Sequence, residues 1–231
     1  MDLMSGKNNR GEYFMKHLLK KALSGIIITT ALFNCTGAYS RVDAIAYSDK
    51  YALTVNGSPI AGGYNNYGDS DCTNYVSQCL YAGGMQQDSI WNSKLYTSGT
   101  GVSTTRKDST AWTLADGLKN YLKDNKNATK LGGWAKTDTQ YGKKYADNNS
   151  SLTIYNTGKT VLFYDWDTDG KMNHAALFVV DNTKSLDTAD GNVTGDLINQ
   201  HSYFRKHAIW HADKRNAHAK TTTIYAFALN V

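Results

Sequence analysis

The chain has 231 residues, enough for one sizeable domain or two small ones. A hydrophobic content of 41% and a charged content of 19% are typical of a globular protein with a substantial core. The formal net charge is +5, but five basic and two acidic residues lie in the first 40 positions. The remaining 20 basic and 18 acidic residues leave +2, which is too weak to indicate a nucleic-acid partner.

Residues 1–40 have the pattern of a secretory signal peptide that begins at Met15. Three lysines are followed by an apolar run at 22–33, which is too short to span a bilayer, and then by small residues suited to cleavage. We therefore expect residues 41–231 to form a single secreted domain without stable membrane insertion. We expect this domain to be a monomer and to be extracellular, where it could associate with the cell wall.

The first expected helix covers 41–53 and is followed by a loop rich in Gly, Asn, Ser and Tyr. The next expected helix begins at Cys72, with Asp71 as a good N-cap residue and Gly83 as the stop signal. Its apolar face consists of residues at helical spacing: Cys72, Tyr75, Val76, Cys79 and Leu80.

Cys72 is the candidate nucleophile of this chain. A thiol in the first helical turn lies near unpaired backbone N–H groups and the positive end of the macrodipole, which both favour the thiolate. The alternative is a buried core cysteine, but the polar Asp-Ser-Asp approach favours a nucleophile. Cys79 is expected in the core. A helix would hold the two Cα atoms about 10 Å apart, beyond the reach of a disulfide at about 7 Å, so Cys72 should stay free.

A second long helix is expected from Asp108, with Trp112 in its core face, and Met85 to Arg106 is expected to be irregular. The polar segment 125–151 is expected to be turn-rich, with a short helix around 140–145. From residue 152 the pattern becomes strand-like, with expected strands at 160–164, 175–180, 197–201 and 223–229. Helices followed by strands predict an α+β fold, in which the Cys72 helix packs on an antiparallel sheet.

His174 is the candidate general base. It opens an expected strand, and the small residues after it would let the Cys72 helix approach closely. A base of this kind must be oriented by a third group. Asn199 and His201 have the period-2 spacing that places both on one face of the next strand, and either could hold the imidazole of His174.

Five features carry a family resemblance: the Tyr- and Ala-rich helix at 41–53, the segment 71–84 around Cys72, Trp112, and the segments 165–174 and 199–202. Together they resemble the putative amidase domain family, a branch of the NlpC-like and CHAP-like papain-type cysteine hydrolases. The resemblance covers nearly all of the chain after the signal peptide, although Tyr75 stands where Phe is more usual.

The resemblance implies a papain-like, NlpC-like fold with Cys72 as nucleophile and His174 as base. It places the third group on the strand that contains Asn199, Gln200 and His201. It also implies hydrolysis of an amide bond, with peptidoglycan as the expected substrate.

Two other motifs suggest metal sites but lack essential ligands. The run 165–170 imitates the start of a calcium loop, with Asp165, Asp167 and Asp169, but position 12 is Ala176 where a Glu is required. We expect an Asp-rich turn there instead. His207 and His211 are four residues apart but lack the Glu of a zinc-protease helix, so they are expected in a solvated basic segment.

The sequence thus predicts acyl transfer from an amide to Cys72, followed by hydrolysis, without a cofactor or a metal. The expected partner is peptidoglycan or a peptide substrate. Two alternatives stay open: a thiol-dependent transferase or ligase with the same Cys–His pair, and an exported wall-binding or host-interacting protein with an inactive papain-like fold.

Overall fold

A computed structural model describes most of the chain after the expected signal peptide. The described residues are 38–59, 62–97, 104–126, 128–135, 156–211, 218 and 221–231. They all belong to one unit, Cys35–Val231. The expected short helix at 140–145 and residues 1–37 lie outside the described residues. None of the helices in the described part of the chain has the length and apolar character needed to cross a bilayer.

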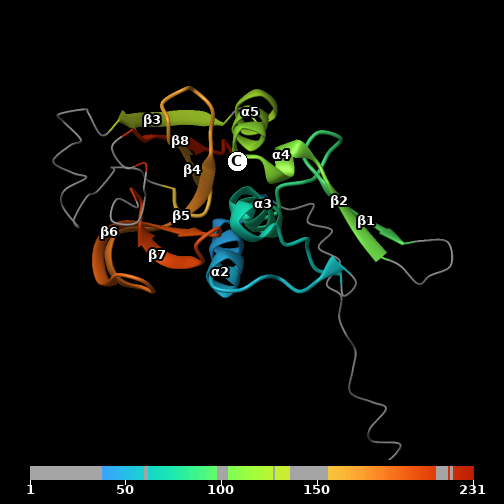
Figure 1. The fold of residues 1–231 in the computed structure, drawn as a ribbon, viewed down its shortest axis with the longest axis horizontal. Helices are drawn as coiled ribbons and strands as arrows, with labels where there is room; N and C mark the ends of the chain where they lie inside the picture. Colours follow the sequence, from blue (N-terminus) through green and yellow to red (C-terminus); the bar gives the residue numbers. More distant parts are fainter. Residues whose placement is uncertain are drawn as a thin grey trace, which may run out of the picture. The chain divides into compact units, whose positions relative to one another are not determined.

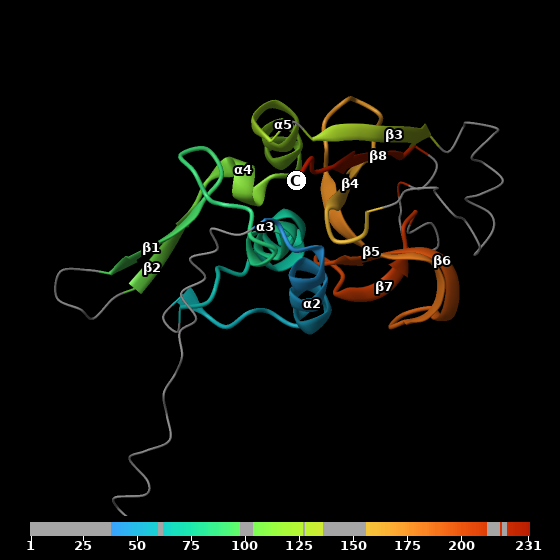
Figure 2. The same cartoon turned by 180° about the vertical axis from the view of Figure 1, so that it is seen from behind.

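The two expected N-terminal helices are present. Helix α2 covers Arg41–Tyr51, and the Ser40 hydroxyl accepts a hydrogen bond from the Asp43 amide at its start. Helix α3 covers Cys72–Ala82 after a 3-10 turn, η2, at Gly68–Ser70, and it ends at Gly83 as predicted. Figures 1 and 2 show α3 between α2 and α5, Ala115–Asn125, beside the larger of two sheets.

The glycine that ends α3 is required by packing. Gly83 has an ordinary helical φ of −71°, and its carbonyl accepts a hydrogen bond from the Ser40 amide. A Cβ atom at this position would lie 2.7 Å from the Tyr39 ring. The positive φ of +100° falls on the next residue, Gly84.

The expected long helix from Asp108 is broken into two. Helix α4 covers Thr110–Thr113 and α5 covers Ala115–Asn125, with Leu114 in an extended conformation between them. The two helices approach so closely that a Cβ atom on Gly117 would lie 2.7 Å from the Thr110 carbonyl oxygen. The apolar positions of the predicted helix are nevertheless buried: Trp112, Ala115, Leu118 and Leu122.

The strands form two antiparallel sheets. A two-stranded sheet joins β1, Ser93–Thr97, to β2, Thr104–Asp108, where irregular structure was expected. The larger sheet has the order β3-β8-β4-β5-β6-β7. Its strands are β3 Thr129–Ala135, β4 Thr160–Asp165, β5 His174–Asp187, β6 Gly191–Gln200, β7 Arg205–Ile209 and β8 Thr223–Ala228.

The mixed α+β class with antiparallel sheets is therefore confirmed, and the four expected strands correspond to β4, β5, β6 and β8. Strand β7 was not predicted, because its residues Arg205–Ile209 were expected in a solvated basic segment; Arg205 and His211 are in fact buried. Strand β3 was also missed. It lies at the edge of the sheet, and its residues Thr129–Ala135 include a charged lysine and two glycines. Such a composition gives little strand signal, because Gly and Lys are depleted in strands.

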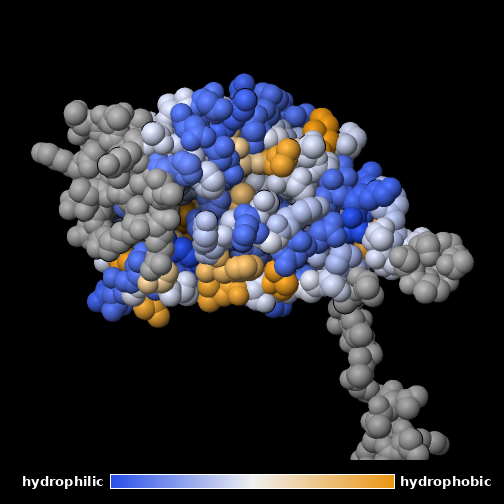
Figure 3. All heavy atoms as spheres, viewed as in Figure 1, coloured by the Kyte–Doolittle hydropathy of each residue, from blue (hydrophilic) through white to orange (hydrophobic). Residues whose placement is uncertain are grey.

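Both faces of the large sheet contribute to the core. Odd-numbered residues of β5, such as Ala175 and Leu177, pack in one cluster with residues of α3 and α5. Even-numbered ones, such as Ala176 and Phe178, pack in a second cluster with residues of β6 and β7. On the surface seen in Figure 3, hydrophobic residues are exposed in small groups among hydrophilic ones. The start of β5 is thus held between two packed layers.

Candidate active site

Cys72 is the first residue of α3, and its thiol contacts the imidazole of His174, the first residue of β5. Only 7% of Cys72 and 5% of His174 is exposed. The Thr73 hydroxyl lies 3.6 Å from the Cys72 sulfur. The start of a helix and the start of a strand therefore meet at a buried thiol–imidazole pair.

The surroundings of Cys72 and His174 favour the thiolate and the imidazolium over the two neutral forms. Burial raises the pKa of the Cys72 thiol, but the charge of His174 and hydrogen bonds from His174, Thr73 and the Ala175 backbone lower it by more, from 9.0 to about 7. Burial lowers the pKa of His174, but the Cys72 charge and hydrogen bonds to Cys72 and Gln200 raise it above its ordinary value of 6.5. A substantial share of Cys72 is therefore thiolate near neutral pH.

Gln200 holds the other side of the imidazole. Its Oε1 lies 3.1 Å from His174 Nε2, and both side chains are buried. An amide oxygen only accepts hydrogen bonds, so Nε2 carries the hydrogen. Nδ1 is then the nitrogen available to the Cys72 thiol. Cys72, His174 and Gln200 form a continuous chain of side-chain contacts.

The expected orienting residues, Asn199 and His201, lie elsewhere, so this expectation is corrected. Asn199 donates to the Ser48 hydroxyl at 2.9 Å and to the Asp49 carboxylate at 2.8 Å. Neither it nor His201 hydrogen-bonds to His174 in the described structure. The residue that contacts His174 lies on the predicted strand, β6, but on the face opposite to that of Asn199. Asn199 pairs with Leu177, so the neighbouring position on β6, Gln200, shares the face of His174.

His201 instead contacts Asp71, which directly precedes Cys72. Its Nδ1 lies 2.6 Å from Asp71 Oδ2, and its Nε2 lies 2.8 Å from the Tyr51 carbonyl oxygen. Asp71 occupies the N-cap position, but its carboxylate does not cap the helix. It accepts hydrogen bonds from the Tyr67 amide at 2.9 Å and from Asn74 Nδ2 at 2.8 Å.

Two further residues support the site but were not singled out as site residues in the sequence. Asn74 Oδ1 accepts a hydrogen bond of 2.8 Å from the Trp112 indole, which ties the first turn of α3 to the core. Trp166 stacks against His174 with ring centroids 6.0 Å apart and an interplanar angle of 21°. Its other ring partner is His218, at 5.4 Å. In the sequence, the run 165–170 predicted an Asp-rich turn, and no pattern predicted a contact between Trp166 and His174.

The Asp-rich run is a hydrogen-bonded turn, as predicted. The Asp165 carboxylate accepts hydrogen bonds from the amides of Asp169, at 3.1 Å, and Gly170, at 2.8 Å. Within the described ranges, no group of three or more His, Cys, Asp or Glu side chains is placed to hold a metal ion. The turn leads the chain from β4 into His174.

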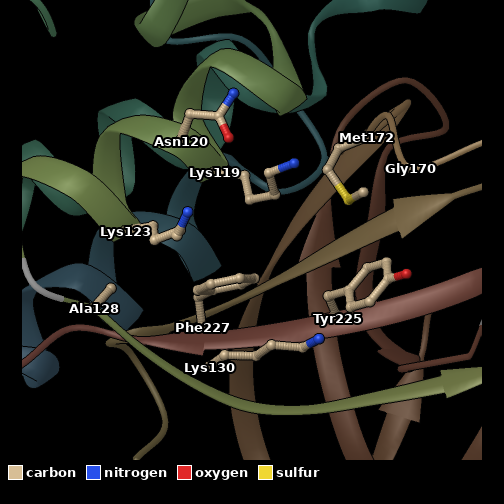
Figure 4. Close-up of a pocket in the computed structure, with 9 residues that line it drawn as sticks. All are labelled: Lys119, Asn120, Lys123, Ala128, Lys130, Gly170, Met172, Tyr225 and Phe227. Atoms are coloured by element: carbon tan, nitrogen blue, oxygen red, sulfur yellow. The ribbon is translucent and has the colours of Figure 1, made fainter.

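A pocket of about 370 Å³ lies between α5, β3, β8 and the turn before β5 (Figure 4). Lys119 and Lys123 from α5 and Lys130 from β3 surround Phe227 and Tyr225. Neither Cys72 nor His174 lines it. Met172, two residues before His174, does line it. The turn that leads into His174 therefore also forms part of the pocket wall.

Comparison with known protein families and with curated proteins found similar sequences. The family model described as "Putative amidase domain" matches residues 38–226, and this description indicates a hydrolase acting on amide bonds. The chain is 27% identical over 190 residues to "Uncharacterized protein YhbB" of Bacillus subtilis (strain 168), covering 82% of this chain and 49% of that protein.

It is 37% identical over 84 residues to "Uncharacterized protein YjcM" of the same organism, covering 36% of this chain and 16% of that protein. The chain thus spans about half or less of the length of these curated relatives. No solved structure matches it. Because the family model covers most of the chain, from residue 38 to residue 226, the protein belongs to the putative amidase domain family.

Proposed function

We propose that the protein is a secreted cysteine amidase that hydrolyses an amide bond in cell-wall peptidoglycan. The observation that carries the proposal is the buried chain of contacts from the Cys72 thiol through His174 to Gln200. A lowered pKa of about 7 at Cys72 supports it, because the thiolate is the nucleophile. The order of the groups, with Cys at a helix start, His at a strand start and an amide on the next strand, supports a papain-type arrangement.

The proposed reaction has two steps. In the first, His174 Nδ1 takes the proton of Cys72, and the thiolate attacks the amide carbonyl carbon. The backbone N–H of Cys72 helps to stabilise the oxyanion. The tetrahedral intermediate collapses as His174 protonates the departing amine, which breaks the C–N bond and leaves a thioester on Cys72.

In the second step, His174 takes a proton from water, and the resulting hydroxide attacks the thioester. The C–S bond breaks, the carboxylic acid leaves, and the proton returns to the thiolate. Throughout, Gln200 Oε1 accepts the Nε2 hydrogen. It holds the ring in one orientation and stabilises the imidazolium form by a charge-assisted hydrogen bond.

Peptidoglycan is the proposed substrate for two reasons. The pattern of residues 1–40 directs the protein out of the cell, where the wall is the abundant source of amide bonds. The pocket beside the His174 turn has three lysines around aromatic rings, which suits a polymer with carboxylate groups and sugar rings. The first observation supports a substrate in the wall, and the second supports binding of its acidic groups beside the turn that leads to His174.

The test is the release of new amino groups from purified peptidoglycan by the full chain, with mass spectrometry of the soluble products. We expect release by the wild type and none by Cys72→Ala. Cys79→Ala is the matched control, since it removes the other buried thiol of α3 and should retain release. The fragment masses would identify the bond.

Equal release by wild type and Cys72→Ala would contradict a cysteine mechanism. If added amines become joined to the acyl product in place of water, the protein is a transferase with the same Cys–His pair. Binding to peptidoglycan that survives Cys72→Ala, without turnover by the wild type, would identify a wall-binding protein instead.

A further inference from the structure

The environment of His201 constrains its protonation. The side chain is 2% exposed, and each ring nitrogen faces an acceptor: Nδ1 faces the Asp71 carboxylate at 2.6 Å and Nε2 faces the Tyr51 carbonyl at 2.8 Å. A neutral imidazole has one N–H group and can satisfy only one of these acceptors, whereas the protonated ring has two. A carbonyl oxygen cannot donate, so the contact with Tyr51 requires a hydrogen on Nε2.

We propose that His201 is a buried imidazolium that neutralises Asp71, and that it acts as a positioning residue for the Cys72 nucleophile. Its link to catalysis rests on the proposed function. The His201–Asp71 ion pair itself does not depend on the proposed function.

The helix ends favour these charges. Tyr51 is the last residue of α2, so its carbonyl belongs to the negative end of that helix, where a cation is stabilised. Asp71 is the N-cap of α3, at the positive end, where a carboxylate is stabilised. His201 therefore joins two helix ends of opposite polarity.

The remaining neighbours of His201 are aromatic. Tyr75 stacks on it with ring centroids 4.0 Å apart and an interplanar angle of 17°, and Phe204 lies at 4.5 Å. Aromatic faces attract cations. Tyr75 adds no negative charge, because burial raises the pKa of its phenol well above the usual value. Among the described contacts of His201, Asp71 is thus the one ionised partner.

The pair matters for Cys72 because Asp71 directly precedes it. An uncompensated carboxylate next to a thiol disfavours the thiolate, since like charges repel. The positive charge of His201 removes this opposition, while Asp71 keeps its hydrogen bonds to the Tyr67 amide and Asn74. Asp71 can then order the loop and the first turn of α3 without suppressing the nucleophile.

The first test is nitrogen NMR of the imidazole rings in the full, unmodified protein at neutral pH. The His201 signals are assigned by their loss in His201→Asn. We expect hydrogen on both ring nitrogens. A single protonated ring nitrogen at His201 would overturn the proposal.

The second test is the rate of Cys72 labelling by iodoacetamide at neutral pH. His201→Asn keeps an N–H toward Asp71 but removes the charge. If the pKa of Cys72 rises by about one pH unit, as a neighbouring like charge can cause, the rate at pH 7 falls about fivefold. The double variant His201→Asn with Asp71→Asn should recover most of the rate, because it removes both charges.

His207→Asn is the matched control. His207 also contacts an aspartate, Asp49, at 3.1 Å, but it lies on β7 and has no described contact with Cys72. The rate of Cys72 labelling in His207→Asn should equal that in the wild type. An unchanged rate in His201→Asn, or a double variant as slow as the single one, would overturn the proposal. Absence of peptidoglycan turnover would reject the proposed function and leave both tests interpretable.

Discussion

Replacing Gln200 by Ala isolates the group that orients His174. The substitution removes the Oε1 acceptor, which lies 3.1 Å from Nε2 in a buried setting. A hydrogen bond to a charged group contributes about 1.5–3 kcal/mol. Because each 1.4 kcal/mol corresponds to about a tenfold change in rate, we expect kcat/KM for peptidoglycan to fall about 10- to 150-fold.

Labelling of Cys72 by iodoacetamide as a function of pH distinguishes a lost orientation of His174 from a general loss of folded structure. In the wild type, the rate should rise as the pH rises through about 7, where the pKa of Cys72 lies. Gln200→Ala weakens the imidazolium that stabilises the thiolate, so its midpoint should lie higher. Gln200→Glu places a carboxylate against Nε2 and strengthens the imidazolium, so its midpoint should lie lower.

Asn199→Ala is the matched comparison for Gln200→Ala. Asn199 is adjacent on β6 and equally buried, but its amide contacts Ser48 and Asp49 on α2. We expect it to lower the free energy of unfolding and to leave the labelling midpoint unchanged. A wild-type midpoint and rate in Gln200→Ala, with a shifted midpoint in Asn199→Ala, would refute the assignment of Gln200.

Three further predictions concern α3. Cys79→Ala should leave the rapid labelling of Cys72 at neutral pH unchanged, because burial raises the pKa of Cys79 far above its usual range; loss of rapid Cys72 labelling would contradict this. Tyr75→Phe removes a hydrogen bond of 2.8 Å to the Ser48 carbonyl and should lower the free energy of unfolding in urea by about 1–2 kcal/mol. Gly83→Ala forces a Cβ atom against the Tyr39 ring and should cost about 1–3 kcal/mol in the same assay, whereas an unchanged midpoint would show that the ring moves freely.

The sequence by itself determined the elements that carry Cys72 and His174. The α3 helix was visible because its apolar residues recur at helical spacing and end at Gly83. Strands β4, β5 and β8 were visible as apolar runs that pack on both faces. These patterns are local, so Cys72 at a helix start and His174 at a strand start were predictable.

Edge elements and helix breaks were less visible. The strands β1, β2 and β3 are polar or glycine-containing, and their pairing partners stabilise them more than their own composition does. The break at Leu114 follows from the close packing of α4 on α5 at Gly117. Apolar spacing alone predicts one continuous helix there.

Only the tertiary structure decided which residue orients His174. The period-2 spacing predicted Asn199 and His201 on one face of a strand, but β6 ends at Gln200, and the spacing did not say which face meets His174. That choice depends on the register between β5 and β6, in which Asn199 pairs with Leu177. Register is set by long-range pairing, and a change of one residue exchanges the two faces of a strand. This is why Gln200, and neither neighbour, contacts the imidazole.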